Sequence, residues 1–331
     1  GEFHDILPGT SIEPVEETSL RLLNHALEEL SRVKARAFFA LASGQPKAKN
    51  EQIPILVYNP HPFKVRTVVE CEFQLADANW AGTWTMLGAY RDGWPVASQI
   101  EKEASNLNLD WRKRIAFMAE LEPCQMNRFD CKSEKVVQTK PTPKLGGRNG
   151  QVRFRSDDIE VVINAKTGLV DRFKAHGIEY LDKDAFEPLV MADNEDPWGM
   201  LHRAYRKVAG RFKLMSAKKS ARFSGVQAAE LPPVRVIEDG PVRSVVEVML
   251  SYNDSFICQR YKLPKQGTEI EVELRVHWNE KDRMLKLSIP VRGTGFESLG
   301  QTAFGINPLP MHGNEAVAQK WVAVVSRRAK S

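Results

Sequence analysis

In the stretch of sequence from residue 268 to 278, polar and apolar residues alternate strictly from Glu269 onward. The apolar positions are Ile270, Val272, Leu274, Val276 and Trp278, and between them lie Glu269, Glu271, Glu273, Arg275 and His277. Side chains of a strand point to opposite faces at a period of two, whereas an α-helix repeats every 3.6 residues. The segment is therefore predicted to be a β-strand with one buried and one solvent-exposed face, as in an antiparallel sheet.

The sequence on both sides of this strand also has the pattern of short β-strands. Further strands are predicted at 241–250, 256–263 and 283–292, and residues 152–173 are predicted to form a hairpin that turns between Asn164 and Gly168. No repeat or low-complexity tract interrupts them. We therefore expect a mainly β fold in which residues 141–331 form a large antiparallel β-sandwich.

A second group of short strands precedes it. Strands are predicted at 53–58 and 64–75, a hairpin turns at Asp92-Gly93, and a pair of strands is split at Glu122-Pro123. This spacing of turns fits a small β-sandwich over residues 46–140. The segment 140–150, rich in Pro, Gly and Lys, is interpreted as the linker between the two sandwiches.

Residues 1–45 contain one long helix. Ser11 is a candidate N-cap, and Pro14 falls in the first turn. Apolar residues then recur at helical spacing on one stripe, at Leu20, Leu23, Leu27, Leu30, Ala37 and Leu41. A helix of about 30 residues is about 45 Å long. We expect its stripe to pack on the β-domains, on a crystal neighbour or on a second copy of the chain.

Composition excludes several classes of protein. The chain has 47 Lys and Arg against 42 Asp and Glu, and a net charge of +5 does not indicate nucleic-acid binding. The apolar runs are shorter than a membrane span, and no signal-peptide pattern opens the chain, so a cytoplasmic location is expected. The four cysteines include no CxxC pair, which predicts buried thiols rather than a zinc knuckle or disulfides.

The first residues of the chain carry its most specific motif. Residues 3–11 read FHDILPGTS, which resembles the motif that ends the catalytic domain of family 38 glycoside hydrolases, the retaining α-mannosidases. The order of a long helix, a small sandwich and a large, mutarotase-like supersandwich is similar to that family. Residues 193–200, DNEDPWGM, and 312–321, HGNEAVAQKW, resemble segments of its large β-domain.

The resemblance implies roles for two N-terminal residues. It implies that His4 is a ligand of a catalytic Zn²⁺ and that Asp5 hydrogen-bonds hydroxyls of the bound mannose; neutral imidazole and a carboxylate suit these tasks. Taken alone, the same pair also fits a turn in which Asp5 caps the helix and His4 is solvated.

The family's site also needs a His-x-Asp pair and a separate Asp nucleophile. None of the seven histidines is followed two residues later by Asp. We therefore expect the chain to be the C-terminal portion of a longer enzyme, with no catalytic residue of its own. One histidine and at most one carboxylate are too few to hold zinc tightly.

Two further motifs are candidates for sugar contacts or for acid–base chemistry. Asp193, Asp196 and Trp198 in DNEDPWGM could line a sugar subsite by hydrogen bonds and stacking, or could form an exposed Asp-Pro turn with Trp198 packed beneath it. His312 and Glu315 could be an acid–base pair, although a turn with hydrogen-bonded side chains is favoured.

The basic stretch between His202 and Arg222 could suggest an anion site. Strands with a wet, basic face are the favoured interpretation, because the sequence carries no nucleic-acid recognition motif.

These observations lead to one preferred function. The chain is interpreted as the C-terminal portion of a zinc-dependent α-mannosidase, which acts on an α-mannoside together with a missing N-terminal catalytic domain. A stand-alone carbohydrate-binding β-sandwich protein and a mutarotase-like epimerase are the alternatives. No nucleic-acid or membrane partner is expected, and a second copy of the chain is a further candidate partner.

Overall fold

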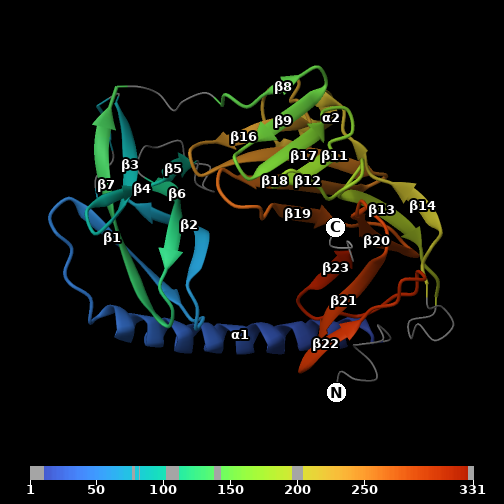
Figure 1. Ribbon diagram of the computed structural model, residues 1–331, viewed down its shortest axis with the longest axis horizontal. Coiled ribbons are helices and arrows are strands. Elements are labelled where there is room, and N and C mark those ends of the chain that lie inside the picture. Colours follow the sequence, from blue (N-terminus) through green and yellow to red (C-terminus); the bar gives the residue numbers. More distant parts are fainter. Residues whose placement is uncertain are drawn as a thin grey trace, which may run out of the picture. The chain divides into compact units, whose positions relative to one another are not determined.

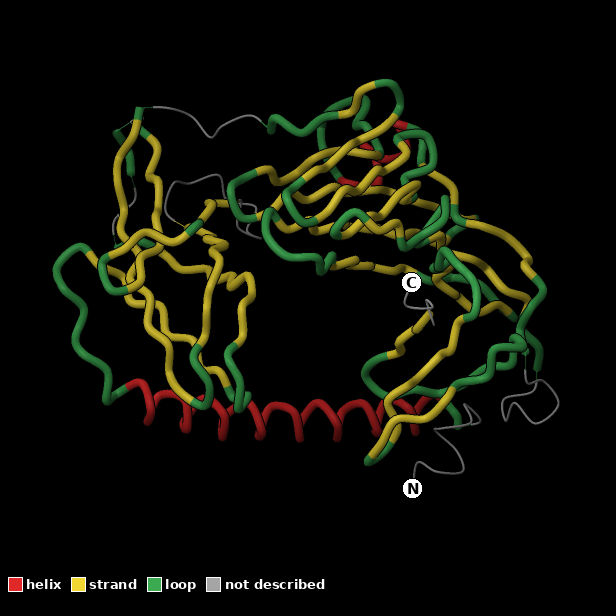
Figure 2. The backbone as a smooth tube through the Cα atoms, in the orientation of Figure 1, coloured by secondary structure: helices red, strands yellow, loops and turns green. Residues whose placement is uncertain are grey.

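The chain folds into two compact units that are mainly β, as predicted (Figures 1 and 2). The computed structural model describes residues 11–76, 79–81, 83–101, 112–137, 143–195 and 204–326. The small unit comprises Ser11–Lys144 together with a six-residue turn, Glu238–Arg243. The large unit comprises Leu145–Ile237 and Ser244–Ser331. No helix in the described ranges is both long enough and apolar enough to cross a membrane.

The small unit begins with α1, a 30-residue helix over Glu13–Ala42. Its N-cap is Ile12, which has an extended backbone, rather than Ser11, and the Ser11 hydroxyl donates to the carboxylate of Glu16 at 3.3 Å. Pro14 lies in the first turn, as predicted. The structure describes every residue of α1, and none is buried.

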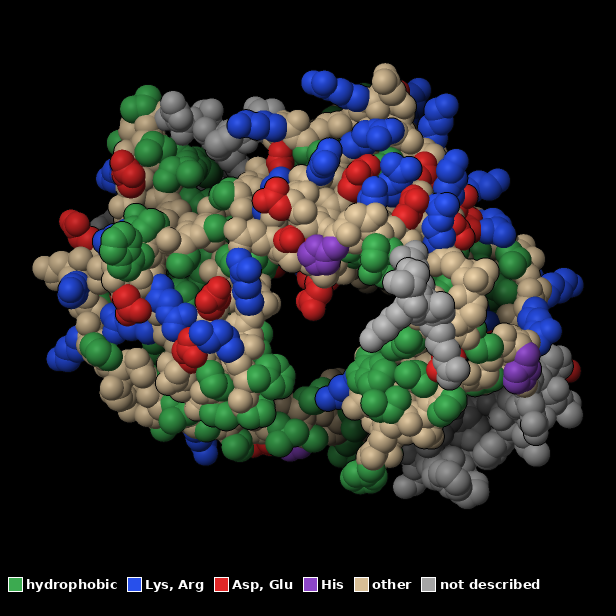
Figure 3. Space-filling view, in the orientation of Figure 1, with side chains coloured by type: hydrophobic (Ala, Val, Ile, Leu, Met, Phe, Trp, Pro, Cys, Tyr) green, Lys and Arg blue, Asp and Glu red, His purple; other side chains and the backbone are tan. Residues whose placement is uncertain are grey.

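The leucine stripe of α1 faces solvent instead of a sheet. Leu20 is 60% exposed and Leu30 is 65% exposed, and green side chains run along the helix in Figure 3. Within the described part of the small unit, the two sheets therefore do not cover this stripe. Packing on a second copy of the chain stays a prediction.

The rest of the small unit is a β-sandwich of two antiparallel sheets. One sheet has the order β1-β7-β3-β4 and the other β2-β6-β5. The two sheets share one core, to which Phe117 and Phe129 contribute rings whose centroids are 4.8 Å apart. Asp92 and Gly93 form the hairpin turn between β3 and β4, as predicted. The strands are β1 (Gln52–Asn59), β2 (Val65–Gln74), β3 (Trp84–Arg91), β4 (Trp94–Val96), β5 (Ser98–Glu101), β6 (Arg112–Leu121) and β7 (Gln125–Val136).

The large unit packs three antiparallel sheets around a second core. Their orders are β12-β11-β10-β9-β8, β14-β13-β20 and β15-β17-β18-β19, with β16 also paired to β17. Residues of all three sheets meet in one hydrophobic cluster. A further sheet has the order β22-β21-β23.

The first strands of the large unit are β8 (Gly147–Arg148), β9 (Gln151–Arg155), β10 (Ile159–Asn164), β11 (Val170–Ala175), β12 (Ile178–Glu179), β13 (Glu187–Ala192), β14 (Val208–Arg211) and β15 (Lys213–Leu214). The later strands are β16 (Val234–Asp239), β17 (Arg243–Tyr252), β18 (Ser255–Pro264), β19 (Glu271–His277), β20 (Arg283–Ser288), β21 (Phe296–Thr302), β22 (Gly305–Pro308) and β23 (Val322–Ser326).

The alternating segment of the sequence is strand β19, at the end of its sheet. Ile270, Val272, Leu274 and Trp278 pack against the core of the large unit, as predicted. Val276 does not, and it is 40% exposed. A strand at the edge of a sheet has a neighbour on one side only, so its apolar face is covered less completely than that of a central strand.

The basic stretch contains a helix that its sequence does not predict. Strands β14 and β15 confirm part of the prediction, but residues Ala217–Ser224 form α2. The Ser216 hydroxyl caps this helix by accepting the Lys219 N–H at 3.2 Å, and Gly225 ends it with a φ of 66°. A capping Ser and a left-handed Gly define a short helix of eight residues, in which the period-3.6 pattern is hard to recognise.

The prediction that the cysteine thiols are buried is correct for only some of the four cysteines. All four cysteines are described and all are free; Cys131 is buried, Cys71 and Cys258 are half-buried, and Cys124 is exposed. Burial raises the pKa of Cys71 to about 11, so this thiol stays protonated at neutral pH.

Candidate functional site

Two strands of the large unit hold the ends of the segment that contains DNEDPWGM. In β13 and β14, Met191 pairs with Val208, and the Ala192 N–H donates to the carbonyl of Lys207 at 2.8 Å. The segment between them therefore leaves and re-enters the sheet at the same point.

Asp193 is the one predicted sugar-contacting residue that the structure describes. Its N–H donates to the carbonyl of Asp282 at 3.0 Å, and its carboxylate accepts the N–H of Asn194 at 2.8 Å. The side chain is half-buried at the end of β13. Asp196 and Trp198 lie outside the described residues, so the structure does not decide between a sugar subsite and an Asp-Pro turn.

Glu315 and Lys286 hold the returning end of this segment. The Glu315 carboxylate accepts the Tyr205 N–H at 3.2 Å and the Lys286 ammonium at 2.5 Å. Lys286 also donates to the carbonyl of Tyr205 at 3.0 Å. The hydrogen bond from Lys286 outweighs partial burial and lowers the pKa of Glu315. We call Tyr205, Lys286 and Glu315 the loop clamp.

A neighbouring contact continues the loop clamp. The Arg206 guanidinium donates to the carbonyl of His312 at 2.6 Å. The two family-like segments, 193–200 and 312–321, are therefore connected through residues 205 and 206. Because Glu315 is paired with Lys286 and His312 accepts through its backbone, the contacts match a hydrogen-bonded turn better than an acid–base pair.

The predicted metal ligand, His4, and the predicted sugar contact, Asp5, lie outside the described residues. Within the ranges that the structure describes, no three His, Cys, Asp or Glu side chains are grouped so that they could hold a metal ion. A catalytic zinc site needs about three protein ligands. The described residues therefore do not form a zinc site.

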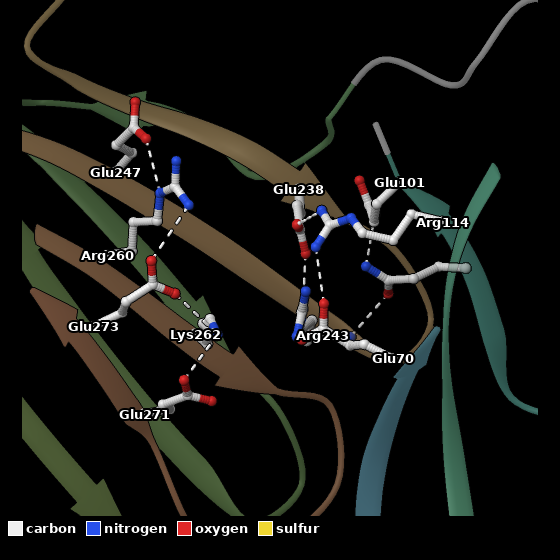
Figure 4. Close-up of polar contacts among 11 residues, drawn as sticks. Glu70, Glu101, Arg114, Glu238, Arg243, Glu247, Arg260, Lys262, Glu271 and Glu273 are labelled. Carbon is white, nitrogen blue, oxygen red and sulfur yellow. Dashed lines mark hydrogen bonds and ion pairs between the residues drawn. The ribbon is translucent and has the colours of Figure 1, made fainter. Parts of the chain in front are cut away.

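Buried charges elsewhere are further candidate sites, because perturbed ionisable groups often mark function. In the small unit, the turn Glu238–Arg243 carries the most deeply buried pair. Arg243 donates to Glu238 at 2.7 Å and to Glu70 at 2.5 Å, and Arg114 donates to Glu70 at 2.8 Å and to Glu238 at 2.5 Å (Figure 4). We call these four residues the turn network.

The same turn is also bound through its backbone. The Gln99 side-chain oxygen accepts the N–H groups of Val242 and Arg243, both at 2.9 Å, and the Gln99 amide donates to Glu101 at 2.7 Å. A Cβ at Gly240 would lie 2.5 Å from that oxygen, so glycine allows this close approach. Every charge of the turn network has a partner of opposite sign, which indicates a structural role.

A second set of charges crosses the strands of the large unit. Glu247 on β17 accepts from Arg235 on β16 and, at 2.8 Å, from Arg260 on β18. The series continues through Glu273 and Lys262 to Glu271, with Lys262 2.7 Å from Glu271 (Figure 4). We call these six residues the strand ladder. Its charges are also paired, so it is not a catalytic candidate.

Comparison with protein families identifies the large unit. Residues 158–330 match the model described as the glycosyl hydrolases family 38 C-terminal domain. That range covers most of the large unit and both segments joined by the loop clamp. No curated protein matches the chain at a significant level.

Solved structures share the fold over most of the chain. An α-mannosidase from Enterococcus faecalis V583 superimposes with a TM-score of 0.61, 11% identity and coverage of 92% of this chain. A family 38 glycosyl hydrolase from Enterococcus faecalis gives a TM-score of 0.52, 10% identity and 79% coverage. The chain spans 39% and 35% of the length of these two proteins.

Proposed function

Because the chain belongs to glycosyl hydrolase family 38, we propose that it forms the C-terminal part of a retaining, zinc-dependent α-mannosidase. The observation that carries this proposal is the family match over residues 158–330. The likeness of the fold to an enzyme named as an α-mannosidase supports it. In this role the chain completes and supports an active site whose remaining residues belong to an N-terminal catalytic domain.

The proposed contribution of this chain to the sugar site is small. Asp5 accepts hydrogen bonds from vicinal hydroxyls of the mannose ring, because one carboxylate has two acceptor oxygens. Asp193, Asp196 and Trp198 are proposed to contact the sugar from the large unit. The loop clamp supports this assignment because it fixes the base of the segment that carries them.

Cleavage with retention needs two carboxyl groups about 5 to 5.5 Å apart, one as nucleophile and one as acid and then base. We assign neither to this chain, since Glu315 is held by Lys286 and the turn network and strand ladder are internally paired. Zinc bound in the longer enzyme would supply positive charge that holds sugar hydroxyls. His4 is proposed as one ligand, and we assign no step of the reaction to the metal.

The test compares the isolated chain with the longer enzyme. The 331-residue chain is expected to show no turnover of an aryl α-mannoside and no stoichiometric zinc after dialysis. The longer enzyme is expected to show both. His4→Ala should remove zinc and turnover, whereas Asp5→Ala should lower turnover more than zinc content.

Matched controls separate these roles from general damage. His61→Ala removes an exposed histidine that stacks only on Phe63, and Asp157→Ala removes an exposed carboxylate. Both should leave zinc and rate unchanged. Mannosidase activity from the 331 residues alone would contradict the proposal that the catalytic carboxyl groups belong to the N-terminal domain. A His4→Ala enzyme that keeps its zinc would contradict the assignment of His4 as a zinc ligand.

A further inference from the structure

A groove of about 580 Å³ opens beside β14 in the large unit. Its lining includes Gly210, Arg211, Lys213, Ser251, Tyr252 and Asn253. Arg211 and Lys213 come from the basic stretch of the sequence, and the other three polar residues come from the end of β17 and the turn that follows it. The function proposed above uses none of these residues.

Buried contacts on both sides fix the shape of this groove. Between β14 and β15 the chain passes from one sheet to another at Phe212, whose ring is buried and whose N–H donates to the carbonyl of Pro188 at 3.2 Å. The Phe212 ring lies 5.9 Å from the ring of Tyr252 and 6.4 Å from that of Trp278, measured between centroids. Lys213 then pairs with Ser251 in the next sheet.

Gly210 allows the Tyr252 ring to lie directly against the backbone of β14. A Cβ at this position would be 2.2 Å from the Tyr252 ring and 2.7 Å from its hydroxyl oxygen. Any other residue would therefore displace the ring, because real Cβ contacts of that length do not occur. The backbone of β14 and the tyrosine form one wall in close contact.

The charges that line the groove are all positive. Arg211 is held by Glu187 on β13, and its guanidinium has five donors, so donors remain for a ligand. Among the described residues, the Lys213 ammonium has no ion pair or hydrogen bond, although its backbone pairs with Ser251. The hydroxyls of Tyr252 and Ser251 have no hydrogen bond in the same part of the chain. Asn253 donates to Glu280 at 3.1 Å. No carboxylate is among the described residues that line the groove.

We propose that this groove binds a phosphate group, either as inorganic phosphate or as the monoester of a small molecule. A dianion next to Lys213 and Arg211 gains charge-assisted hydrogen bonds, and the hydroxyls of Ser251 and Tyr252 add neutral donors. The close contact of the Tyr252 ring with Gly210 means that the Tyr252 hydroxyl is already positioned for a ligand. The proposal does not rest on the α-mannosidase function.

The test measures binding of inorganic phosphate to the full 331-residue chain by isothermal titration calorimetry, at constant ionic strength maintained with chloride. Wild-type protein is expected to bind in a saturable manner. Lys213→Gln should weaken binding at least tenfold, because it removes the unpaired ammonium. Lys218→Gln makes the same charge change on an exposed residue of α2 outside the groove, and should change binding less than twofold.

A second titration shows whether the groove prefers free phosphate or a phosphate monoester. If glycerol 3-phosphate binds more tightly than inorganic phosphate, the preferred ligand is a monoester; equal binding indicates that the groove recognises the free anion. Tyr252→Phe keeps the ring and should weaken binding by a smaller factor than Lys213→Gln. The proposal is overturned if phosphate shows no saturable binding, if both lysine variants lose the same affinity, or if glycerol alone binds as well as its phosphate. Circular dichroism melts confirm that each variant is folded.

Discussion

The turn network and the strand ladder are built from the same residues, arginine or lysine and glutamate, yet they differ in their exposure to water. In the turn network the Arg243 side chain is 5% exposed and the Glu238 side chain 7%. At the outer end of the strand ladder, the Glu271 side chain is 63% exposed. The pairs have similar distances, 2.7 Å in both cases.

This difference shows why ion-pair distances alone do not measure stability. A buried ion has lost its hydration, so each member of the turn network depends on its partners. Burial alone would lower the pKa of Arg243, but the hydrogen bonds to Glu70 and Glu238 outweigh it and raise that pKa. An exposed ion can return to water when its partner is removed, so the outer strand ladder should contribute little.

The largest effect is expected for Arg243→Met. Methionine fills similar space but removes the buried cation, so that the buried Glu238 keeps only Arg114 as a charged partner in the turn network. Breaking a buried pair costs about 3 to 5 kcal/mol, which should appear in urea unfolding of the small unit. Arg292→Met is the matched control, because Arg292 is 54% exposed and pairs with Glu179 at 2.9 Å. Equal losses in the two variants would refute the comparison.

A smaller effect is expected for Glu247→Gln, at the buried end of the strand ladder. The Glu247 side chain is 7% exposed and accepts from two arginines, whereas glutamine keeps the shape and loses the charge. Hydrogen bonds to charged groups contribute about 1.5 to 3 kcal/mol, so the expected loss in free energy of unfolding is about 2 kcal/mol. A loss as large as that of Arg243→Met would mean that the two networks do not differ.

The pH dependence of stability should identify Glu247 independently. Burial disfavours its charged form, but the hydrogen bonds from Arg235 and Arg260 prevail and hold the pKa of Glu247 below its ordinary value near 4.5. Its contribution is therefore fully present above the ordinary pKa and is lost as the pH falls through the lowered value. Thermal melts of wild type and Glu247→Gln should converge toward acidic pH. Parallel curves would exclude this linkage.

The smallest effect is expected for Glu271→Gln. This carboxylate pairs with Lys262 across β18 and β19 but is mostly in water. Its removal should cost less than about 1 kcal/mol, and the difference should disappear in about 1 M salt, where the Debye length is about 3 Å. A salt-independent loss above that value would show that the exposed end of the ladder is more strongly coupled than its geometry indicates.

The sequence predicts local features of this fold better than remote ones. The alternation around β19 and the turn at Asp92-Gly93 are visible in consecutive residues, because strand period and turn chemistry are local properties. The exposure of Val276 is not visible in consecutive residues, because it depends on β19 lying at the end of the strand order in its sheet. The periodicity of α1 likewise predicts an apolar face but does not specify whether a sheet or a second copy of the chain covers that face.

The contacts of the candidate site are predicted by the sequence even less well than the fold. HGNEAVAQKW and DNEDPWGM were both recognised, but nothing in either motif indicates that Glu315 contacts Tyr205, 110 positions earlier. Lys286 lies in an ordinary strand, β20, and no motif surrounds it. Contacts between residues distant in sequence come from sheet order and register, which a single sequence does not specify.

The six-residue turn Glu238–Arg243 also determines how this protein can be divided. The chain passes from the small unit to the large one after Lys144, returns at Glu238, and leaves again after Arg243. A gene cut between Lys144 and Leu145 would therefore yield an N-terminal fragment that lacks the Glu238–Arg243 part of its compact unit. The C-terminal fragment would carry Arg243 away from Glu70 and Gln99, leaving a buried ionic group uncovered. Separate production is expected to give poorly soluble halves, whereas co-expression should allow them to reassociate as a split protein.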